Sequence, residues 1–323
     1  MRAHFECART DTTAPVGLTR VRVGPISSTY PGRPAEIGAD DLDDSTSRFG
    51  SERTQSNNAH NLVSIDLVTT TREVTYDIDG LTMVGHMSRP EGGGPWPAVL
   101  LGHDGVGLDD YQRGRADDLA EHGYLTFAMD YHGSRTFFGE PQGMLDRVLP
   151  LMTDPARMLT IGQAALNVLL AEPGADHNQL ATLGYGAGGR IVLELARTGV
   201  PFKALAVIHP GLPTPRAEDW TNAGGTFLLC TGSEDPICTP AQVLTFSSAL
   251  QDAGVDWRAH IYGGAKHAFW AAPTQPDGSP TGGSDHLNPT VPGVGYHAAH
   301  AARAWLAVLD LFSESIGAQS PAF

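Results

Sequence analysis

The chain has 323 residues, of which 41% are hydrophobic, so it is long enough to bury a sizeable core. Its formal net charge of −15 at pH 7 argues against nucleic acid or an anionic membrane surface as a partner. No apolar run approaches the ~20 residues of a membrane span, residues 1–12 lack the apolar core of a secretion signal, and the three cysteines show no C-x-x-C motif, so we expect a cytoplasmic protein.

Residues 1–60 differ in composition from the rest of the chain. They are rich in Thr, Ser, Gly, Pro and Arg, carry an acidic patch at residues 40–44 and show little hydrophobic periodicity. This composition predicts a flexible N-terminal extension. An arm that binds a partner and a mis-assigned start codon are alternatives that the sequence leaves open.

The remainder of the chain, predicted as one domain over residues 61–315 with a C-terminal tail at 316–323, alternates between strand and helix patterns. Residues 73–78 and 81–87 flank Asp79-Gly80, a pair typical of a β-hairpin turn. Apolar runs then predict strands at residues 96–102, 124–129, 179–185, 202–209, 226–231 and 257–262. Helices are expected at residues 115–122, 160–171, 189–198, 240–253 and 297–312. This alternation predicts a mostly parallel, doubly wound sheet with helices on both faces.

Polar residues follow the ends of the predicted strands. In chain order they are His103 and Asp104, then Asp130, Tyr131 and His132, then Gly186, Asp235 and His267. Ligands collect at the carboxyl ends of the strands in a doubly wound sheet, so we expect a site at this edge. The loop at residues 272–295, rich in Pro, Gly and Asp, is long enough to cover it.

The segment Gly184-Tyr185-Gly186-Ala187-Gly188 has the spacing of the strand-to-helix elbow of α/β hydrolases. The middle position of that elbow carries the nucleophile, whereas here it is Gly186, which has no side chain. The spacing also imitates a dinucleotide fingerprint, but the following strand does not end in the acidic residue that a ribose would need. The histidines show no paired metal-ligand spacing, so no metal is expected.

Five segments together carry a family resemblance. They are residues 101–107 (LGHDGVG), 117–124 (DDLAEHGY), 183–190 (LGYGAGGR), 232–236 (GSEDP) and 262–269 (YGGAKHAF). By their order and spacing, the chain from about Glu73 to Phe312 resembles the dienelactone hydrolase family of α/β hydrolases. The resemblance implies an α/β-hydrolase fold and a Cys-His-Asp triad that acts on lactones or esters without a cofactor.

Under this resemblance, His267 and Asp235 match the histidine and the acid of the triad, while Gly186 falls on the nucleophile. Asp104 falls where family members often carry Glu, and we expect it to act as a further catalytic acid or base. The backbone amides of Ala187 and Gly105 are the expected oxyanion hole. Predicted substrate contacts are His103, Tyr185, His132, Arg135 and Trp270.

Each of these residues also has an ordinary structural explanation when it is taken alone. Asp235, which precedes a proline, is a plausible cap of the following helix, and His103 and Asp104 suit a turn. His267 lies in a glycine-rich loop where a polar residue is common. The order elbow, acid, histidine along the chain nevertheless favours a functional His-Asp pair.

Three functions are compatible with such a site. In the first, His267 transfers protons in an isomerisation, elimination, carbon–carbon cleavage or cyclisation of a small unsaturated carbonyl compound. In the second, His267 activates water to hydrolyse an ester or lactone. In the third, the protein is a pseudo-hydrolase that binds a ligand without converting it. In all three the partner is a small carbonyl, ester or lactone molecule; a homodimer is compatible with the sequence, which does not fix the oligomeric state.

Overall fold

The computed structural model describes residues 67–272 and 290–317 of the chain. The predicted extension at residues 1–60 and most of the predicted tail lie outside the described residues, as does the greater part of the predicted loop. The predicted domain boundaries therefore stay predictions. The helices and strands below belong to the described part alone.

The first two strands form the predicted hairpin. Strand β1 (Thr69–Ile78) pairs antiparallel with β2 (Leu81–Pro90), and Asp79 and Gly80 connect them. Both connecting residues have positive φ values, +52° and +77°. A two-residue turn of this kind matches the right-handed twist of the paired strands, which is why Asp-Gly favours it.

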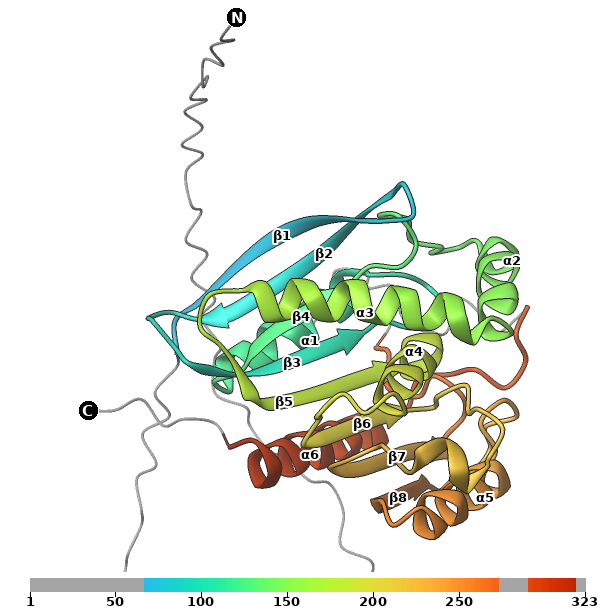
Figure 1. Cartoon of the computed structure of the whole chain (residues 1–323). Helices are drawn as coiled ribbons and strands as arrows, with labels where there is room; N and C mark the ends of the chain where they lie inside the picture. Colours follow the sequence, from blue (N-terminus) through green and yellow to red (C-terminus); the bar gives the residue numbers. More distant parts are fainter. Residues whose placement is uncertain (1–66, 273–289, 318–323) are drawn as a thin grey trace, which may run out of the picture. The chain divides into compact units, whose positions relative to one another are not determined.

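The other strands extend the hairpin into one eight-stranded sheet with the order β1-β2-β4-β3-β5-β6-β7-β8 (Figure 1). Strand β4 pairs antiparallel with β2, and every pairing from β4 to β8 is parallel. These six strands are β3 (Trp96–Gly102), β4 (Leu125–Met129), β5 (Ala175–Tyr185), β6 (Ala204–Ile208), β7 (Thr226–Gly232) and β8 (Asp256–Tyr262). Their carboxyl ends lie at one edge of the sheet.

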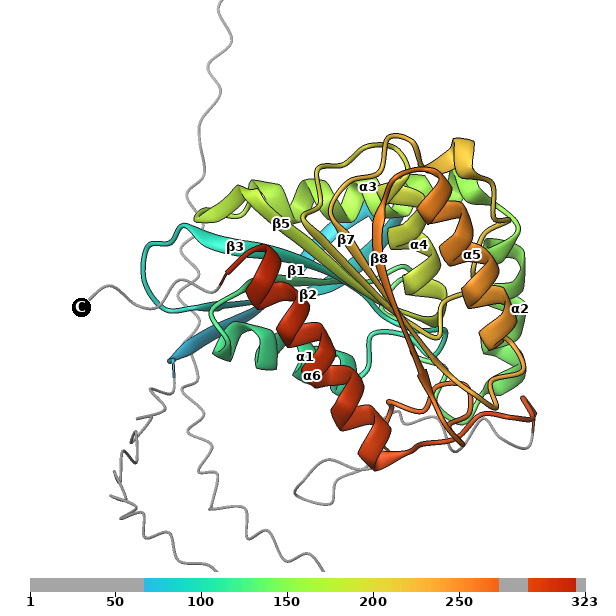
Figure 2. The same ribbon diagram turned by 90° about the horizontal axis from the view of Figure 1, so that it is seen from below.

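Helices cover both faces of this sheet (Figure 2). On one face lie α1 (Asp110–Glu121), which contacts β2 and β4, and α6 (Ala298–Ser315), which contacts β6 and β7. On the other lie α2 (Pro141–Met152), α3 (Pro155–Ala171), α4 (Gly186–Ala196) and α5 (Pro240–Asp252). The predicted fold class, an α/β-hydrolase fold with a mostly parallel, doubly wound sheet, is confirmed.

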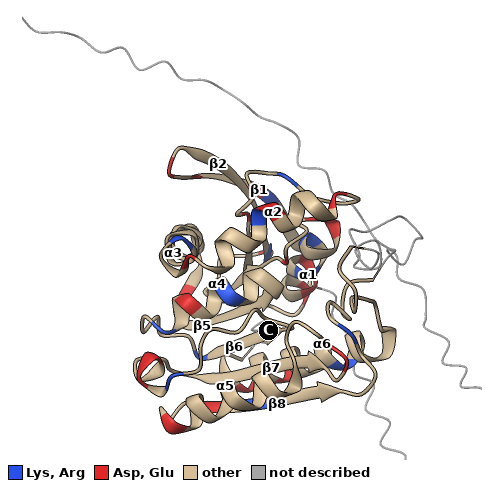
Figure 3. Cartoon of the chain, turned by 90° about the vertical axis from the view of Figure 1, so that its right-hand side faces the viewer, with Lys and Arg blue, Asp and Glu red and all other residues tan. Residues whose placement is uncertain are grey.

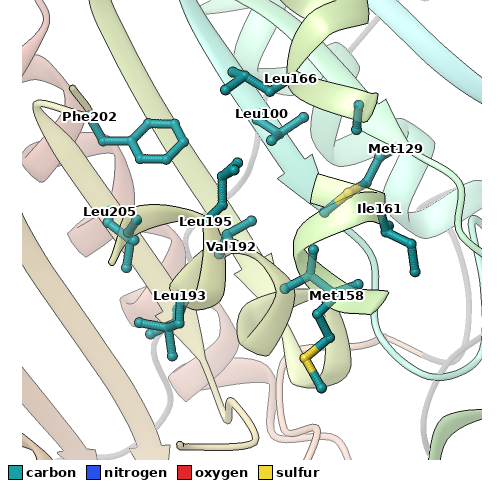
Figure 4. Close-up of a cluster of buried hydrophobic side chains, with 14 of the residues drawn as sticks. Leu100, Met129, Met158, Ile161, Leu166, Val192, Leu193, Leu195, Phe202 and Leu205 are labelled. Carbon is teal, nitrogen blue, oxygen red and sulfur yellow. The ribbon is translucent and has the colours of Figure 1, made fainter. Parts of the chain in front are cut away.

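Each parallel strand contributes side chains to two cores. In β3, Leu100 belongs to the core under α3 and α4, whereas Val99 and Leu101 belong to the core under α1 and α6. Figure 4 shows the first core, in which Met158 and Ile161 of α3 lie close to side chains of α4. Burying one such apolar side chain stabilises the fold by about 1.5–3 kcal/mol. The strands β6 and β7 carry no charged residue (Figure 3), as expected for strands covered on both faces.

Several helical segments differ from the sequence prediction, and α3 and α4 begin five and three residues earlier than expected. Helix α1 begins five residues earlier than expected, because the side chain of Asp109 accepts a hydrogen bond from the Gln112 amide and caps it. Helix α2 and a short 3₁₀ helix at Ala217–Trp220 were not predicted. Of the helices in the described residues, none combines the length and apolarity that crossing a bilayer requires.

Candidate active site

The turn from β5 into α4 has the shape expected of an elbow. Gly186 opens the helix with a φ of +48°, a left-handed conformation that glycine adopts at little cost. A Cβ atom on Gly188 would lie 2.2 Å from the backbone oxygen of His103, and the Gly188 amide donates a hydrogen bond to that same oxygen. The spacing of these glycines therefore has a structural reason, the close approach of α4 to the end of β3.

His267 and Asp235 lie side by side beyond the ends of β8 and β7. The Nδ1 atom of His267 is 3.0 and 2.9 Å from the two carboxylate oxygens of Asp235. The Asp235 side chain is fully buried, and its Oδ1 also accepts hydrogen bonds from the amides of Ile237 and Cys238. Since a carboxylate only accepts, the neutral imidazole carries its proton on Nδ1 and has its lone pair on Nε2. This tautomer can act as a base through Nε2.

Residues 293–295 fix the backbone around His267. The His267 amide donates to the Gly293 carbonyl over 2.9 Å, and the Gly295 amide donates to the His267 carbonyl over 3.0 Å. Together they form a parallel bridge between His267 and Val294. The catalytic candidate is therefore held on both sides of its backbone.

One cavity of about 160 Å³ brings together His267, Gly186, Ala187, Asp104 and Gly105. Within the described residues, most of the remaining lining is apolar and is formed by Met144, Leu145, Val148, Leu149, Met152, Ile237, Ala268, Val291 and Val294. An apolar cavity of about 150 Å³ holds a single benzene ring. The space is therefore suited to a ligand built on one small ring.

Asp104 is a buried carboxyl at the edge of this cavity. Burial, together with the negative charge of Asp109, raises the pKa of Asp104 to about 7, although the Val106 amide donates to its Oδ1 over 2.9 Å. Near neutral pH this group is therefore present in both its protonated and its ionised form. A carboxyl that titrates near the working pH suits general acid or base catalysis.

Ala187 and Gly105, the predicted oxyanion hole, both line the cavity. Ala187 lies in the first turn of α4, where backbone N–H groups have no acceptor within the helix. The positive end of the helix dipole lies at the same place and favours a negative ligand group. The arrangement is suited to an oxyanion.

Two predicted substrate contacts, His103 and His132, instead hold the backbone of the loop that carries Asp104. Nδ1 of His103 is 2.5 Å from the Asp104 carbonyl oxygen, and Nε2 of His132 is 3.1 Å from the Gly105 carbonyl oxygen. The Tyr131 hydroxyl also donates to the Asp104 carbonyl over 2.7 Å. Burial lowers the pKa of both histidines to about 3, so both rings are neutral. The rings of His103 and His132 therefore orient the backbone of the loop that carries Asp104.

Arg135, Tyr185 and Trp270 also lie away from the cavity lining, as far as the described residues form it. The side chain of Arg135 is 56% exposed and pairs with Glu140 over 2.6 Å. Tyr185 and Trp270 are buried and pack against each other with ring centroids 4.1 Å apart. The structure thus brings His267, Asp104 and the predicted oxyanion residues to one cavity, with Asp235 bound to His267 outside the lining, but it does not bring the predicted substrate contacts there.

His209, which the sequence analysis did not select, lies in the same cavity. It follows β6, is 1% exposed, and its ring centroid is 4.3 Å from that of His267. A Cβ atom on Gly186 would be 3.2 Å from Cε1 of His209, so this ring occupies part of the space above the elbow. The available indication in the sequence was its place at the end of the apolar strand predicted at residues 202–209, near the edge where the other site residues were expected.

Residues 83–316 match the sequence profile of the dienelactone hydrolase family. The chain belongs to the dienelactone hydrolase family. In structure it is similar to a dienelactone hydrolase-like promiscuous phosphotriesterase from metagenomic libraries, with 31% identity and a TM-score of 0.68 over 77% of this chain and 99% of that chain.

Two curated relatives are less similar to this chain in sequence. A Synechocystis sp. protein named "Putative carboxymethylenebutenolidase" is 24% identical over 266 residues, which is 79% of this chain and 100% of its own length. A Bradyrhizobium sp. protein named "Probable 2-oxo-3-(5-oxofuran-2-ylidene)propanoate lactonase" is 24% identical over 201 residues, which is 59% of this chain and 80% of its own length.

The dienelactone hydrolase resemblance implies a cysteine at the elbow, where this chain has Gly186. Neither cysteine of the described residues is suited to replace it. Burial, with the charge of Asp235, raises the pKa of Cys238 to about 12, and burial raises that of Cys230 to about 12 as well. The thiolate is the reactive form, so both thiols are inert near neutral pH.

Proposed function

We propose that this chain is an enzyme that transfers protons in a small unsaturated carbonyl compound of the lactone class, without a covalent intermediate. The observation that carries the proposal is the alignment of His267 with Asp235 at a cavity whose elbow residue is Gly186. Such an imidazole is a prepared base, but the elbow has no side chain for it to activate. The expected reaction is an isomerisation, elimination, carbon–carbon cleavage or ring closure.

In the proposed reaction, Nε2 of His267 removes a proton from a carbon next to the substrate carbonyl. Asp235 stabilises the imidazolium that forms, and the charge that develops on the carbonyl oxygen is held by the amides of Ala187 and Gly105. The pKa of Asp104 is raised to about 7, so this group can return a proton to the product or accept one near neutral pH. Each of these groups lies on the same cavity except Asp235, which supports His267 from behind.

The substrate class rests on the size and lining of the cavity and on the family. A volume of about 160 Å³ with a wall of Met, Leu and Val side chains favours a compact, weakly polar ring. The names of two relatives refer to unsaturated lactones, a butenolide and an oxofuran-2-ylidene propanoate. An unsaturated five-membered lactone meets both requirements.

The family itself favours a second candidate, hydrolysis by water. In this alternative His267 activates a water molecule that stands where the nucleophile of a hydrolase would be. The same base and the same oxyanion hole would serve, so mutation of His267 alone does not separate the two reactions. The origin of the product oxygen does separate them.

The test is turnover of a butenolide with acidic hydrogens next to its carbonyl, 5-methyl-2(3H)-furanone, and of 4-nitrophenyl acetate in ¹⁸O-labelled water, followed by mass spectrometry. Loss of an α-proton and return of a proton to the γ-carbon would convert this butenolide into its conjugated isomer. We expect the native protein to convert the butenolide into a product without ¹⁸O, and His267→Ala to lower kcat/KM by about 100-fold or more. A product that carries one ¹⁸O atom would establish the hydrolytic alternative. Saturable binding of the butenolide with neither turnover nor deuterium exchange in D₂O would identify a binding protein.

The substitution Gly186→Cys tests whether the elbow can still hold a nucleophile. It places a thiol at the position of the family nucleophile, and we expect it to form a covalent acyl-enzyme with 4-nitrophenyl acetate that the native protein does not form. The added Cβ would lie 3.2 Å from Cε1 of His209, so that ring must move by a few tenths of an ångström. The unfolding temperature of the variant is measured first, to show that the elbow tolerates it.

A further inference from the structure

Among the described residues that line the cavity, His209 is the one with a polar side chain that has no role in the proposed reaction. Its ring is almost fully buried, and Nδ1 would be 3.5 Å from a Cβ atom on Gly186. Nδ1 therefore faces the place where the side chain of a hydrolase nucleophile would begin. No atom among the described residues forms a hydrogen bond with it.

The neighbour on the other side of the ring fixes its tautomer. The indole Nε1 of Trp270 donates a hydrogen bond to Nε2 of His209. An indole N–H can only donate, so Nε2 must hold the lone pair and the neutral ring must carry its proton on Nδ1. The planes of the two rings are nearly parallel, with an interplanar angle of 10° and centroids 5.9 Å apart.

Burial keeps this ring uncharged. It lowers the pKa of His209 well below its ordinary value, and the nearby charge of His267 lowers the pKa further, while the residue's own backbone carbonyl partly opposes both. Trp270 is itself held in place, because it packs on Tyr185 and its carbonyl accepts from the Tyr111 hydroxyl over 2.8 Å. The result is a rigid, neutral N–H donor for which the described residues supply no hydrogen-bond acceptor in regular geometry.

The backbone at His209 is also unusual. Its φ is +43°, in the left-handed region that few residues other than glycine adopt, and its amide donates to the Cys230 carbonyl over 2.8 Å. Strained residues and buried donors without partners concentrate at functional sites, where the bound ligand supplies the missing contact.

We propose that His209 is a catalytic residue that donates a hydrogen bond from Nδ1 to the substrate oxygen on which negative charge develops. This inference rests on the proposed function, because it assigns a third donor to the oxygen held by Ala187 and Gly105. The lone pair of the ring is engaged by Trp270, so His209 does not act as the base or as a replacement nucleophile. No proton leaves the ring, and the hydrogen bond strengthens as the oxygen becomes anionic.

The tautomer is tested without turnover, by ¹⁵N NMR of the imidazole nitrogens in the native protein and in His267→Ala. We expect a neutral ring protonated on Nδ1 at every pH from about 5 to 8. Trp270→Phe removes the indole donor and is expected to yield a mixture of the two tautomers. A ring that is protonated on Nε2, or charged at pH 7, overturns the inference, and it does so whether or not the protein converts a lactone.

The contact with substrate is tested by two substitutions of His209. His209→Asn keeps an amide donor near the position of Nδ1 and tolerates a positive φ, whereas His209→Leu fills the space without a donor. We expect His209→Leu to lower kcat for the butenolide by about 100- to 1,000-fold, and His209→Asn to recover at least a tenth of the native value. Equal losses in both variants, with unchanged unfolding temperatures, would show that the donor is not used.

A probe that is bound but not converted separates this inference from the proposed function. Furan-2-carboxylate has one ring and an anionic oxygen, and we expect it to shift the Nδ1 resonance of His209 and to bind at least tenfold more weakly to His209→Leu than to His209→Asn. If that holds while the butenolide is not converted, the donor is present and the reaction is wrongly assigned. If the probe binds both variants equally well, the donor role is wrong.

Discussion

At the edge of the cavity, the buried carboxyl of Asp104 couples the stability of the protein to pH. Its pKa is raised to about 7 in the folded chain, against roughly 3.9 for an unperturbed aspartate. Between these values the folded state binds more protons than the unfolded state, so its contribution to stability is complete at low pH and is lost as the pH rises through 7.

We therefore predict that Asp104→Asn becomes more stable relative to the native protein as the pH rises from about 5 to 8. The amide cannot ionise, and its oxygen can still accept from the Val106 amide. The measurement is the difference between the two unfolding temperatures by calorimetry at both pH values. A difference that does not change with pH would contradict the raised pKa.

Asp109→Asn provides the control for the cause of that shift. The charge of Asp109 is the second contribution to the raised pKa of Asp104, after burial, so its removal is expected to lower that pKa. Asparagine is as good a helix cap as aspartate, so α1 keeps its first turn. A ¹³C NMR titration of the Asp104 carboxyl, in the native protein and in the variant, measures the change.

At the scale of single elements, a substitution in the turn of the β1–β2 hairpin tests how backbone conformation alone affects the free energy of unfolding. A Cβ atom on Gly80 would meet no atom within 4 Å, but the residue has a φ of +77°. We predict that Gly80→Ala lowers the free energy of unfolding by about 1 kcal/mol, because only the left-handed conformation is penalised. Urea unfolding measures it.

Gly93→Ala is the matched control for the hairpin. Gly93 has equally open surroundings, and its φ lies outside the left-handed range. Alanine there restricts the unfolded chain and is expected to leave the protein as stable as before or up to about 1 kcal/mol more stable. Similar destabilisation in both variants would contradict the assignment of the Gly80 effect to backbone conformation.

Helix α2 is the element that sets the size of the cavity. Val148 lines it, and one of its methyl carbons would lie 3.2 Å from a Cβ atom on Gly105, so the wall is close to the predicted oxyanion hole. We predict that Val148→Phe raises KM for the butenolide at least tenfold, because the larger ring fills the space that the substrate needs. Val148→Ala should instead accept substrates with an added methyl or ethyl group.

The readout of these α2 variants is the split between KM and kcat. Val148 carries no group that takes part in proton transfer, so kcat at saturation is expected to change by less than about tenfold. A loss confined to kcat, with unchanged KM, would mean that α2 does not contact the substrate.

Helix α2 is also the α-helix that the sequence analysis did not predict. Its residues PQGMLDRVLPLM contain Pro141, Gly143 and Pro150, which are the usual indications of turns. In the structure Pro141 stands in the first turn, where its missing N–H costs nothing, and Pro150 stands in the last turn. The apolar positions Met144, Val148 and Met152 recur every four residues and would have indicated a helix had the prolines been discounted.

Across the whole molecule, the sheet could be predicted because each buried strand is a short, continuous apolar run between turn residues. The position of the site could also be predicted, because the carboxyl ends of parallel strands share one edge. The orientation of side chains there could not. His103 and Tyr185 lie at that edge but point into packed regions, whereas His209, at an equivalent position, faces the cavity. That difference depends on contacts such as the one with Trp270, which comes from a distant part of the chain.

Global stability reports on the elbow, because Tyr185 before it and Ala187 after it belong to the two buried cores. Gly186→Ala combines a φ of +48° with a Cβ 3.2 Å from Cε1 of the buried His209. We predict that it lowers the free energy of unfolding by about 1–3 kcal/mol, which corresponds to a decrease of roughly 2–12 °C in Tm for a domain of this size.

Gly114→Ala should act in the opposite direction in the same assay. Gly114 lies inside α1, a Cβ atom there would meet nothing within 4 Å, and its φ is not left-handed. Alanine favours a helix interior over glycine by about 1 kcal/mol, so Tm is expected to rise by roughly 2–4 °C. Opposite signs for two Gly→Ala changes would show that the elbow keeps the strained geometry of a nucleophile turn although it carries no nucleophile. A Gly186→Ala variant as stable as the native protein would mean that His209 does not occupy the space above the elbow, and would remove the steric basis of its proposed role.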